Sequence, residues 1–121
     1  MSNIKTYIID YDWKAQMTVE IDHDIMTEAG LREINQFWSD DHRREQKFGL
    51  LNGVLVMLAQ LVIPEAQVQG YSLAGVVGMF NWGSGNGQEG WPPMDGSEGI
   101  KITAIDISGL FDSDDITIKV A

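Results

Sequence analysis

The sequence predicts an α+β fold, in which an antiparallel sheet of about four strands carries helices packed on one face. Strand patterns lie at both ends of the chain and helical patterns occupy the middle, in the order ββααα-loop-ββ. Runs of strands separated from runs of helices are typical of α+β proteins. With 121 residues, of which 44% are hydrophobic, we expect one domain over residues 1–121.

Two neighbouring strands are expected near the N-terminus, at residues 3–11 and 15–22. In the second, Met17, Val19 and Ile21 alternate with polar residues, so these three side chains share one face of a strand. The short connection between the two strands is rich in acidic and aromatic residues. The pair is therefore predicted to form an antiparallel hairpin.

The helical region begins at Thr27, whose hydroxyl is suited to cap a helix over residues 28–38. Residues 39–41 resemble a second cap, and a broad apolar stripe then continues to Ile63. We expect this helix to end near Ile63 or to run a turn beyond it, and Pro64 either kinks it or starts a short new one. Because the second helix is the most apolar, we expect it at the centre of the helical layer, with the stripe consisting of Phe48, Leu51, Val54, Leu55, Leu58, Leu61 and Val62.

The rest of the chain predicts one more helix, a loop and two strands. Apolar residues over 73–80 repeat at helical spacing, although two glycines leave a strand as the alternative. A glycine-rich loop follows over 81–99. Residues 100–107 alternate with a slip in phase, as a β-bulge produces, and 116–120 alternate as a last strand after an acidic turn at 112–115.

The charge is strongly negative, with 18 Asp and Glu against 8 Lys and Arg, or −10 in total. Such a field repels nucleic-acid phosphates and anionic lipids, so neither is an expected direct partner. It attracts basic protein surfaces. The small basic cluster of Arg43, Arg44 and Lys47 is expected to pair with neighbouring acids, namely Asp40, Asp41 and Glu45.

The candidate partner-binding residues are acids on or beside the first hairpin and two tryptophans that bracket the freest part of the loop. If the acids converge, they form an edge that docks on a basic groove, whereas plain solubility is the alternative reading. The tryptophans either anchor the loop to the core or contact a partner. These candidates are Asp10, Asp12, Glu20, Asp22, Asp24, Trp82 and Trp91.

No catalytic, cofactor or metal site is predicted. The absence of cysteine excludes disulfides and thiol chemistry. Gly85, Gly87 and Gly90 fit a literal GxGxxG pattern, but two prolines follow where a dinucleotide site requires the start of a helix. His23 and His42 lack convincing catalytic partners, and the acidic turn at 112–115 lacks the glycine and glutamate of a calcium loop.

The expected location is the cytoplasm. The N-terminus has no apolar signal core. The longest apolar-rich stretch, residues 50–63, is interrupted by Asn52, Gly53 and Gln60 and is too short to cross a bilayer.

Two stretches together resemble a known family, namely residues 31–39 (LREINQFWS) and residues 88–101 (QEGWPPMDGSEGIK). The chain resembles, over nearly its whole length, a family of short bacterial proteins carried on phages, plasmids and other mobile elements. The resemblance implies a genomic setting and no catalytic residues. Small acidic proteins in that setting are often counter-defence factors, anti-CRISPR proteins among them, which is an argument by analogy.

The leading hypothesis is a non-enzymatic interaction protein that binds a basic surface of a host protein, such as a nucleic-acid-binding defence complex. One alternative is a small enzyme or ligand-binding domain that uses the 81–99 loop as a lid. Another is a housekeeping oligomeric module of the mobile element. A homodimer is compatible with the sequence, which does not fix the oligomeric state.

Overall fold

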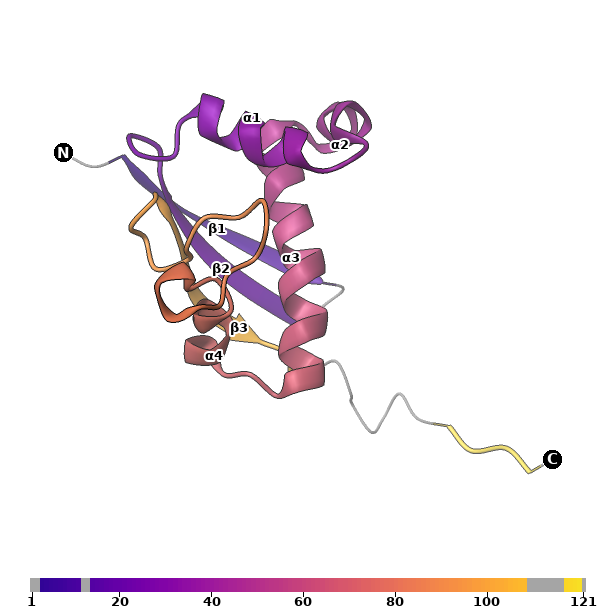
Figure 1. Cartoon of the computed structure of the whole chain (residues 1–121). Helices are drawn as coiled ribbons and strands as arrows, with labels where there is room; N and C mark the ends of the chain where they lie inside the picture. The colour runs from indigo at the N-terminus through magenta and orange to yellow at the C-terminus, as the bar shows by residue number, and fades with distance from the viewer. Residues whose placement is uncertain (1–2, 12–13, 109–116, 121) are drawn as a thin grey trace.

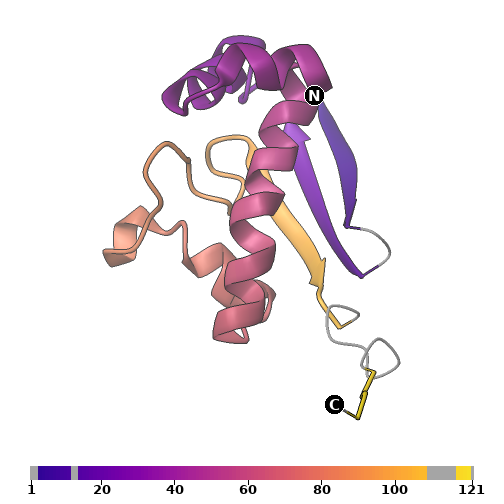
Figure 2. The same cartoon turned by 90° about the vertical axis from the view of Figure 1, so that its right-hand side faces the viewer.

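The computed structural model describes residues 3–11, 14–108 and 117–120, and these have the predicted α+β architecture. The sheet has the order β1-β2-β3, and the helices lie together on one side of it (Figures 1 and 2). The strands are β1 (Ile4–Tyr11), β2 (Ala15–Asp22) and β3 (Ile100–Asp106). The helices are α1 (Glu28–Phe37), α2 (Asp41–Phe48), α3 (Leu50–Gln69) and α4 (Leu73–Gly78), and the 3-10 turn η1 (Trp82–Ser84) follows α4.

Strands β1 and β2 form the predicted antiparallel hairpin, and β3 pairs antiparallel with the other side of β2. The alternating residues of β2 face the helices and are fully buried, as their spacing predicts. Between β2 and β3, Thr18 pairs with Ala104 while Val19 pairs with Ile102. Thr103 is therefore the extra residue of a bulge, which confirms the predicted slip in phase.

The sheet has three strands in the part of the chain that the structure describes, so the prediction of about four was too high by one. Residues 117–120 have no regular secondary structure. The predicted turn at 112–115 and Ile116 lie outside the described residues. A further strand could pair only with a free edge of the sheet, and the edge formed by β3 is partly occupied by the segment that precedes it. In that segment Asp95 forms a β-bridge with Lys101, and the Met94 carbonyl accepts a hydrogen bond from the Ile102 N–H (3.1 Å).

Helix α1 begins as its sequence predicts. The Thr27 hydroxyl accepts a hydrogen bond from the Gly30 N–H (3.4 Å), and Glu28 lies in the first turn, where the helix dipole favours a carboxylate. Met26 and Leu31, at the spacing of a hydrophobic staple, are both buried.

The predicted long second helix is two helices, because the chain breaks at Gly49, which has φ +84°. Asp40 caps α2, but it is left-handed (φ +64°) and its side chain makes no capping hydrogen bond. The split separates a highly charged segment with no buried residue from the apolar α3. Helix α3 continues through Pro64 to Gln69, between one and two turns beyond Ile63 and slightly further than predicted.

Helix α3 lies across the sheet and supplies the centre of the core (Figure 1). Leu55 and Leu58 are buried, which confirms the prediction for this face. The helix is also long and apolar enough to cross a membrane by length and composition alone, so the expectation that this stretch is too short was wrong, because the helix extends six residues beyond Ile63. Its buried side, however, packs as the core helix of an α+β protein, with Val54, Leu58 and Val62 in one cluster with Met17, Val19 and Ile21.

Helix α4 settles the alternative over residues 72–80 in favour of a helix, with Val76 fully buried. Phe80, two residues after its end, is the largest fully buried side chain among the described residues. The two glycines within the helix do not prevent it, because burial of the apolar side outweighs their low helix propensity.

The turn between α1 and α2 is held by Asn35, a buried polar residue. Its Oδ1 accepts from Arg44 Nε (2.6 Å), and its Nδ2 donates to the Asp41 carbonyl (3.2 Å). Arg44 also donates to the backbone carbonyls of Asn35 (3.0 Å) and Ser39 (3.2 Å). Arg44 therefore joins two helices through amide and carbonyl groups, and its predicted pairing with neighbouring acids is wrong.

Asn35→Ala is expected to lower the free energy of unfolding by about 2–3 kcal/mol, because it leaves the Arg44 guanidinium and a backbone carbonyl without their partner. Urea denaturation monitored by tryptophan fluorescence measures the change. Gln36→Ala, on the exposed side of the same helix, is the control and should stay within about 0.5 kcal/mol of the wild type. Equal effects of the two substitutions would refute a structural role for this network.

Candidate functional site

The glycine-rich loop is folded back on α4 rather than projecting from the molecule. The Gly87 N–H donates to the Met79 carbonyl (2.9 Å), and the Asn86 amide donates to the Gly78 carbonyl (3.3 Å). Gly87 has φ +108°, and a Cβ there would lie 2.4 Å from the Trp82 ring. Only glycine allows this turn and this approach. The part of the loop that the sequence marks as the freest therefore makes specific contacts.

The two tryptophans have different roles in this loop. Trp91 is buried in the core together with Met94, so at this end the structure favours the anchor over the alternative of a partner contact. Trp82 remains 49% exposed, and its indole N–H donates to the Trp91 carbonyl (3.1 Å). The loop follows a helix and leads to β3, so its GxGxxG pattern lacks the strand-to-helix setting of a dinucleotide site.

A groove of about 500 Å³ lies between α1 and the far half of the loop, and we call it the acidic groove. Its floor consists of buried Met26, Ile34 and Trp91. Its apolar rim includes the half-exposed side chains of Ile25 and Phe37. These residues come from segments far apart in the sequence that the fold brings side by side.

Close backbone contacts hold the two walls of the acidic groove together. Gly90 has φ +82°, and a Cβ there would lie 2.4 Å from the Phe37 ring, so the ring lies directly against the loop backbone. On the other side, the Asp22 N–H donates to the Gly99 carbonyl (2.8 Å), which fixes the turn before β3 beside the end of β2. The groove is therefore a built feature of the fold.

The charged residues that line the acidic groove are Glu33 and Glu98. Neither takes part in an ion pair within the described residues. The adjacent cation, Arg32, is held away from the groove by Glu28 (3.3 Å) and Glu45 (3.1 Å). These hydrogen bonds, first that of Glu28 and then that of Glu45, raise the pKa of Arg32 above its ordinary value.

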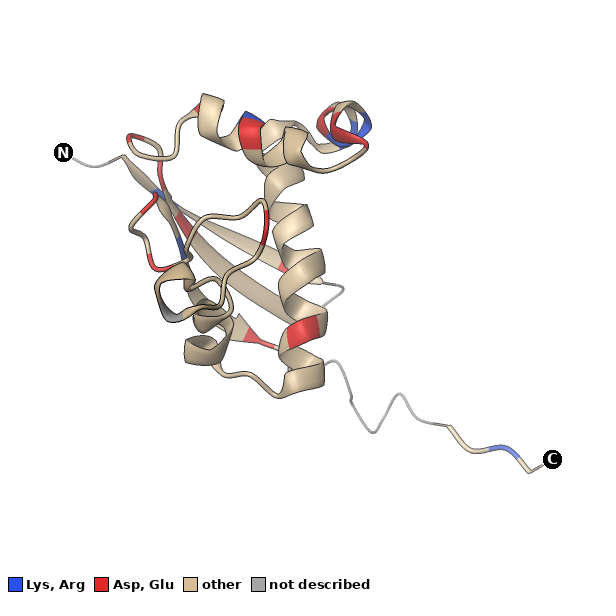
Figure 3. Ribbon diagram, viewed as in Figure 1, with Lys and Arg blue, Asp and Glu red and all other residues tan. Residues whose placement is uncertain are grey.

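More carboxylates lie around the same end of the sheet (Figure 3). Asp22 accepts a hydrogen bond from the Asp24 N–H (3.0 Å), next to Ile25 on the groove rim. In the turn before β3, hydrogen bonds from the Ser97 hydroxyl and backbone N–H lower the pKa of Asp95. Lys5 and Lys101 lie at this end of the sheet as well. The carboxylates that a cationic side chain would meet inside the acidic groove are therefore those of Glu33 and Glu98.

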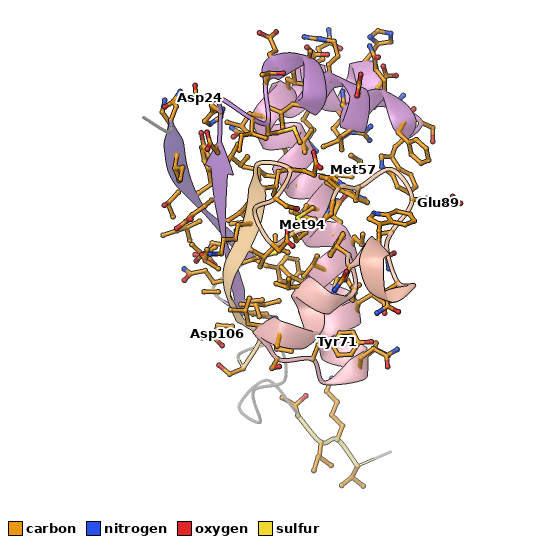
Figure 4. The ribbon with its side chains drawn as sticks, turned by 60° about the vertical axis from the view of Figure 1, so that its left-hand side comes forward. Asp24, Met57, Tyr71, Glu89, Met94 and Asp106 are labelled. Atoms are coloured by element: carbon orange, nitrogen blue, oxygen red, sulfur yellow. The ribbon has the colours of Figure 1, made fainter. Side chains whose placement is uncertain are left out.

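The structure separates the predicted acidic residues of the hairpin. Glu20, Asp22 and Asp24 lie at the end of the sheet near the groove. Asp10 pairs with Gln16 toward the opposite end, about 20 Å along the strands from Asp22 and about 14 Å from Glu20. Asp12 lies outside the described residues. Figure 4 shows Asp24 at one end of the sheet and Asp106 at the other.

The two histidines do not form a catalytic pair. His23 Nε2 hydrogen-bonds the Tyr7 hydroxyl (2.8 Å), and the two rings meet edge to face. His42 is exposed, and its Nε2 lies 3.9 Å from a carboxylate oxygen of Asp41. Within the described residues, no three His, Cys, Asp or Glu side chains are close enough to hold a metal ion.

Trp91 is the one lining residue of the acidic groove that the sequence analysis named as a candidate. The residues it did not indicate include Ile25, Glu33, Phe37 and Glu98. The sequence hinted at an exposed role for Phe37, because this aromatic residue comes after the apolar positions of α1 but does not belong to the buried stripe of the helix. Glu33 and Glu98 lie 65 positions apart in the sequence, and only the fold of the loop shows that they face one groove.

Comparison with known proteins gives the chain its family. Residues 16–118 match the model of a family described as "Protein of unknown function (DUF2528)". The chain belongs to this family. Protein ea10 of Escherichia phage lambda is 63% identical over 122 residues, with 100% of both chains covered. The lambda prophage-derived protein ea10 of Escherichia coli O6:H1 strain CFT073 gives the same values.

The family confirms the resemblance to proteins carried on phages and other mobile elements, since both relatives are encoded by phage lambda or by a prophage derived from it. No solved structure matches the fold. The fold and the acidic groove are therefore described from this chain's own structure, without a solved structure for comparison.

Proposed function

We propose that this chain is a non-enzymatic interaction protein of a phage, which acts in the host cytoplasm by binding a basic surface of a host protein. The acidic groove is the proposed contact site. The observation that carries the proposal is the placement of Glu33 and Glu98 beside the half-exposed Phe37 ring, with no cation lining the groove, in a chain of net charge −10.

The groove has the chemistry to hold an arginine or lysine side chain. A guanidinium forms charge-assisted hydrogen bonds with carboxylates and also stacks on an aromatic face, which here is the Phe37 ring. The long alkyl stem of either cation packs on apolar surface while its charge stays at the rim. The buried Met26 and Trp91 of the floor, and Ile25 on the rim, supply that apolar surface.

The favoured class of partner is a nucleic-acid-binding protein of the host, because such a protein displays a basic surface for phosphates. A chain with this charge would compete with the phosphates for that surface. A counter-defence inhibitor, of the anti-CRISPR type, is the specific form of this proposal that the phage setting of the relatives supports.

Affinity capture from host lysate tests the proposal, with the chain as bait at about 0.1 M and about 1 M salt. The screening length falls from about 10 Å to about 3 Å over this range. We expect the partner's association rate to fall several-fold or more, because steering by charge depends on salt. We also expect added nucleic acid to displace the partner. A partner that is indifferent to both salt and nucleic acid would contradict the proposal.

A further inference from the structure

Strand β1 is an edge strand, since β2 pairs with one side of it and no strand among the described residues pairs with the other. It is eight residues long, and three of its apolar or aromatic side chains, Ile4, Ile8 and Tyr11, are more than half exposed. A long exposed edge with apolar side chains is a template for pairing with another strand.

An apolar groove of about 380 Å³, which we call the edge groove, adjoins the end of this strand. Ile9 and Tyr11 of β1 form one wall, and Val56, Ile63 and Pro64 of α3 form the other. The edge groove lies at the hairpin-turn end of the sheet, opposite the end that meets α1 and the acidic groove. Apolar side chains of an added strand would enter it while their backbone pairs with β1.

The C-terminal segment 117–120 has the complementary properties. Ile118 and Val120 alternate with polar residues, as in a strand with one buried face. Both are almost fully exposed, at 93% and 99%, and the segment extends away from the rest of the chain (Figures 1 and 2). Burial of these two aliphatic side chains against another surface would therefore be favourable.

We propose that residues 117–120 of a second copy add to the β1 edge as a fourth strand, with Ile118 and Val120 in the edge groove. The exchange is reciprocal, so the product is a symmetric dimer in which each β1 edge is paired over part of its length. The fourth strand that the sequence predicts is then supplied by the partner copy rather than by the same chain.

The alternation of side chains gives the proposal a specific charge pairing. Tyr7, Ile9 and Tyr11 pair with the helix-facing residues of β2, so Ile9 and Tyr11 point to the helix side and Asp10 to the open side. Directly opposite residues on paired strands face the same side. With Ile118 and Val120 beside Ile9 and Tyr11, Lys119 lies opposite Asp10, in either strand direction.

Disulfide cross-linking tests this pairing cleanly because the chain has no cysteine. A size-tagged chain with Asp10→Cys is mixed with an untagged chain with Lys119→Cys and oxidised mildly. Directly opposite residues of paired strands have Cα atoms about 4.5–5.5 Å apart, within the range that a disulfide spans. We expect a tagged–untagged dimer as the main cross-linked product on a non-reducing gel.

The matched control replaces Asp10→Cys by Asp24→Cys, an exposed site at the other end of the sheet (Figure 4), and should give little mixed dimer. A third sample carries Asp10→Cys and Lys119→Cys in one chain. Mainly intrachain disulfide in that sample would overturn the exchange between copies. Equal cross-linking from Asp24→Cys and Asp10→Cys, or none from either, would overturn the strand pairing itself.

Self-association of the unmodified chain gives an independent measure by sedimentation equilibrium. Ile118→Asp should raise the dimer dissociation constant by about 10–100-fold, since it places a charge where an aliphatic side chain is to be buried. Val68→Asp is the control, because Val68 is 77% exposed on α3 and does not line the edge groove. A monomeric wild type, or equal effects of the two substitutions, would overturn the proposal.

Discussion

Replacing Leu58 by alanine is expected to lower the free energy of unfolding by about 2–5 kcal/mol, from lost transfer energy and the cavity left behind. Leu58 has no exposed surface, and it belongs to the cluster in which α3 packs on β2. Chemical denaturation followed by tryptophan fluorescence measures the loss.

Val68→Ala is the matched control on the same helix, because Val68 is exposed and its truncation removes no core contact. It should change the free energy of unfolding by no more than about 0.5 kcal/mol. A loss below about 1 kcal/mol for Leu58→Ala would mean that this side of α3 does not form the centre of the core.

The second large effect is expected at Gly99, where alanine should cost about 2–5 kcal/mol. Gly99 has φ +94°, and an added Cβ would lie 2.6 Å from the backbone N of Met26. The left-handed backbone costs an alanine roughly 1–2 kcal/mol, and a contact this short adds an overpacking cost of about 1–3 kcal/mol. Thermal and urea denaturation both report the change.

Gly70→Ala separates these two costs. Gly70 also has a positive φ of +67°, but an added Cβ would meet nothing within 4 Å. Its substitution should therefore cost only about 1–2 kcal/mol. If the two variants are equally stable, the close packing of the turn before β3 against Met26, and with it this wall of the acidic groove, is incorrect.

Local patterns of the sequence predict most of the fold. The alternation in β2, the Thr27 cap and the apolar stripe of α3 each act over a few residues, and the structure confirms all three. The sequence analysis missed the break at Gly49. A glycine between a charged segment and an apolar one is compatible with one continuous helix as well as with two helices. The positive φ of Gly49, which ends α2 and separates it from α3, is known only from the structure.

The acidic groove could not be predicted in the same way, because it depends on contacts between distant segments. Phe37 and Gly90 meet across 53 positions of sequence, and Gly99 meets Met26 across 73. The sequence indicates that the loop contains glycines but not which ring each one contacts. The sequence does predict the negative charge, and it offers Trp91 as a buried anchor. It therefore indicates the kind of residues in the site but not where in the fold they come together.

The most direct test of the proposed function compares Glu33→Lys with Glu65→Lys in binding to the captured host partner. Both are exposed helical glutamates, and each substitution changes the net charge by the same amount, but Glu33 lines the acidic groove whereas Glu65 lies on α3 outside it. We expect Glu33→Lys to weaken binding by at least about 10-fold, since it places a like charge against a basic partner. Glu65→Lys should change the affinity by no more than a few-fold. Equal losses from both would show that only the overall charge matters, and no loss from Glu33→Lys would show that the partner does not use the acidic groove.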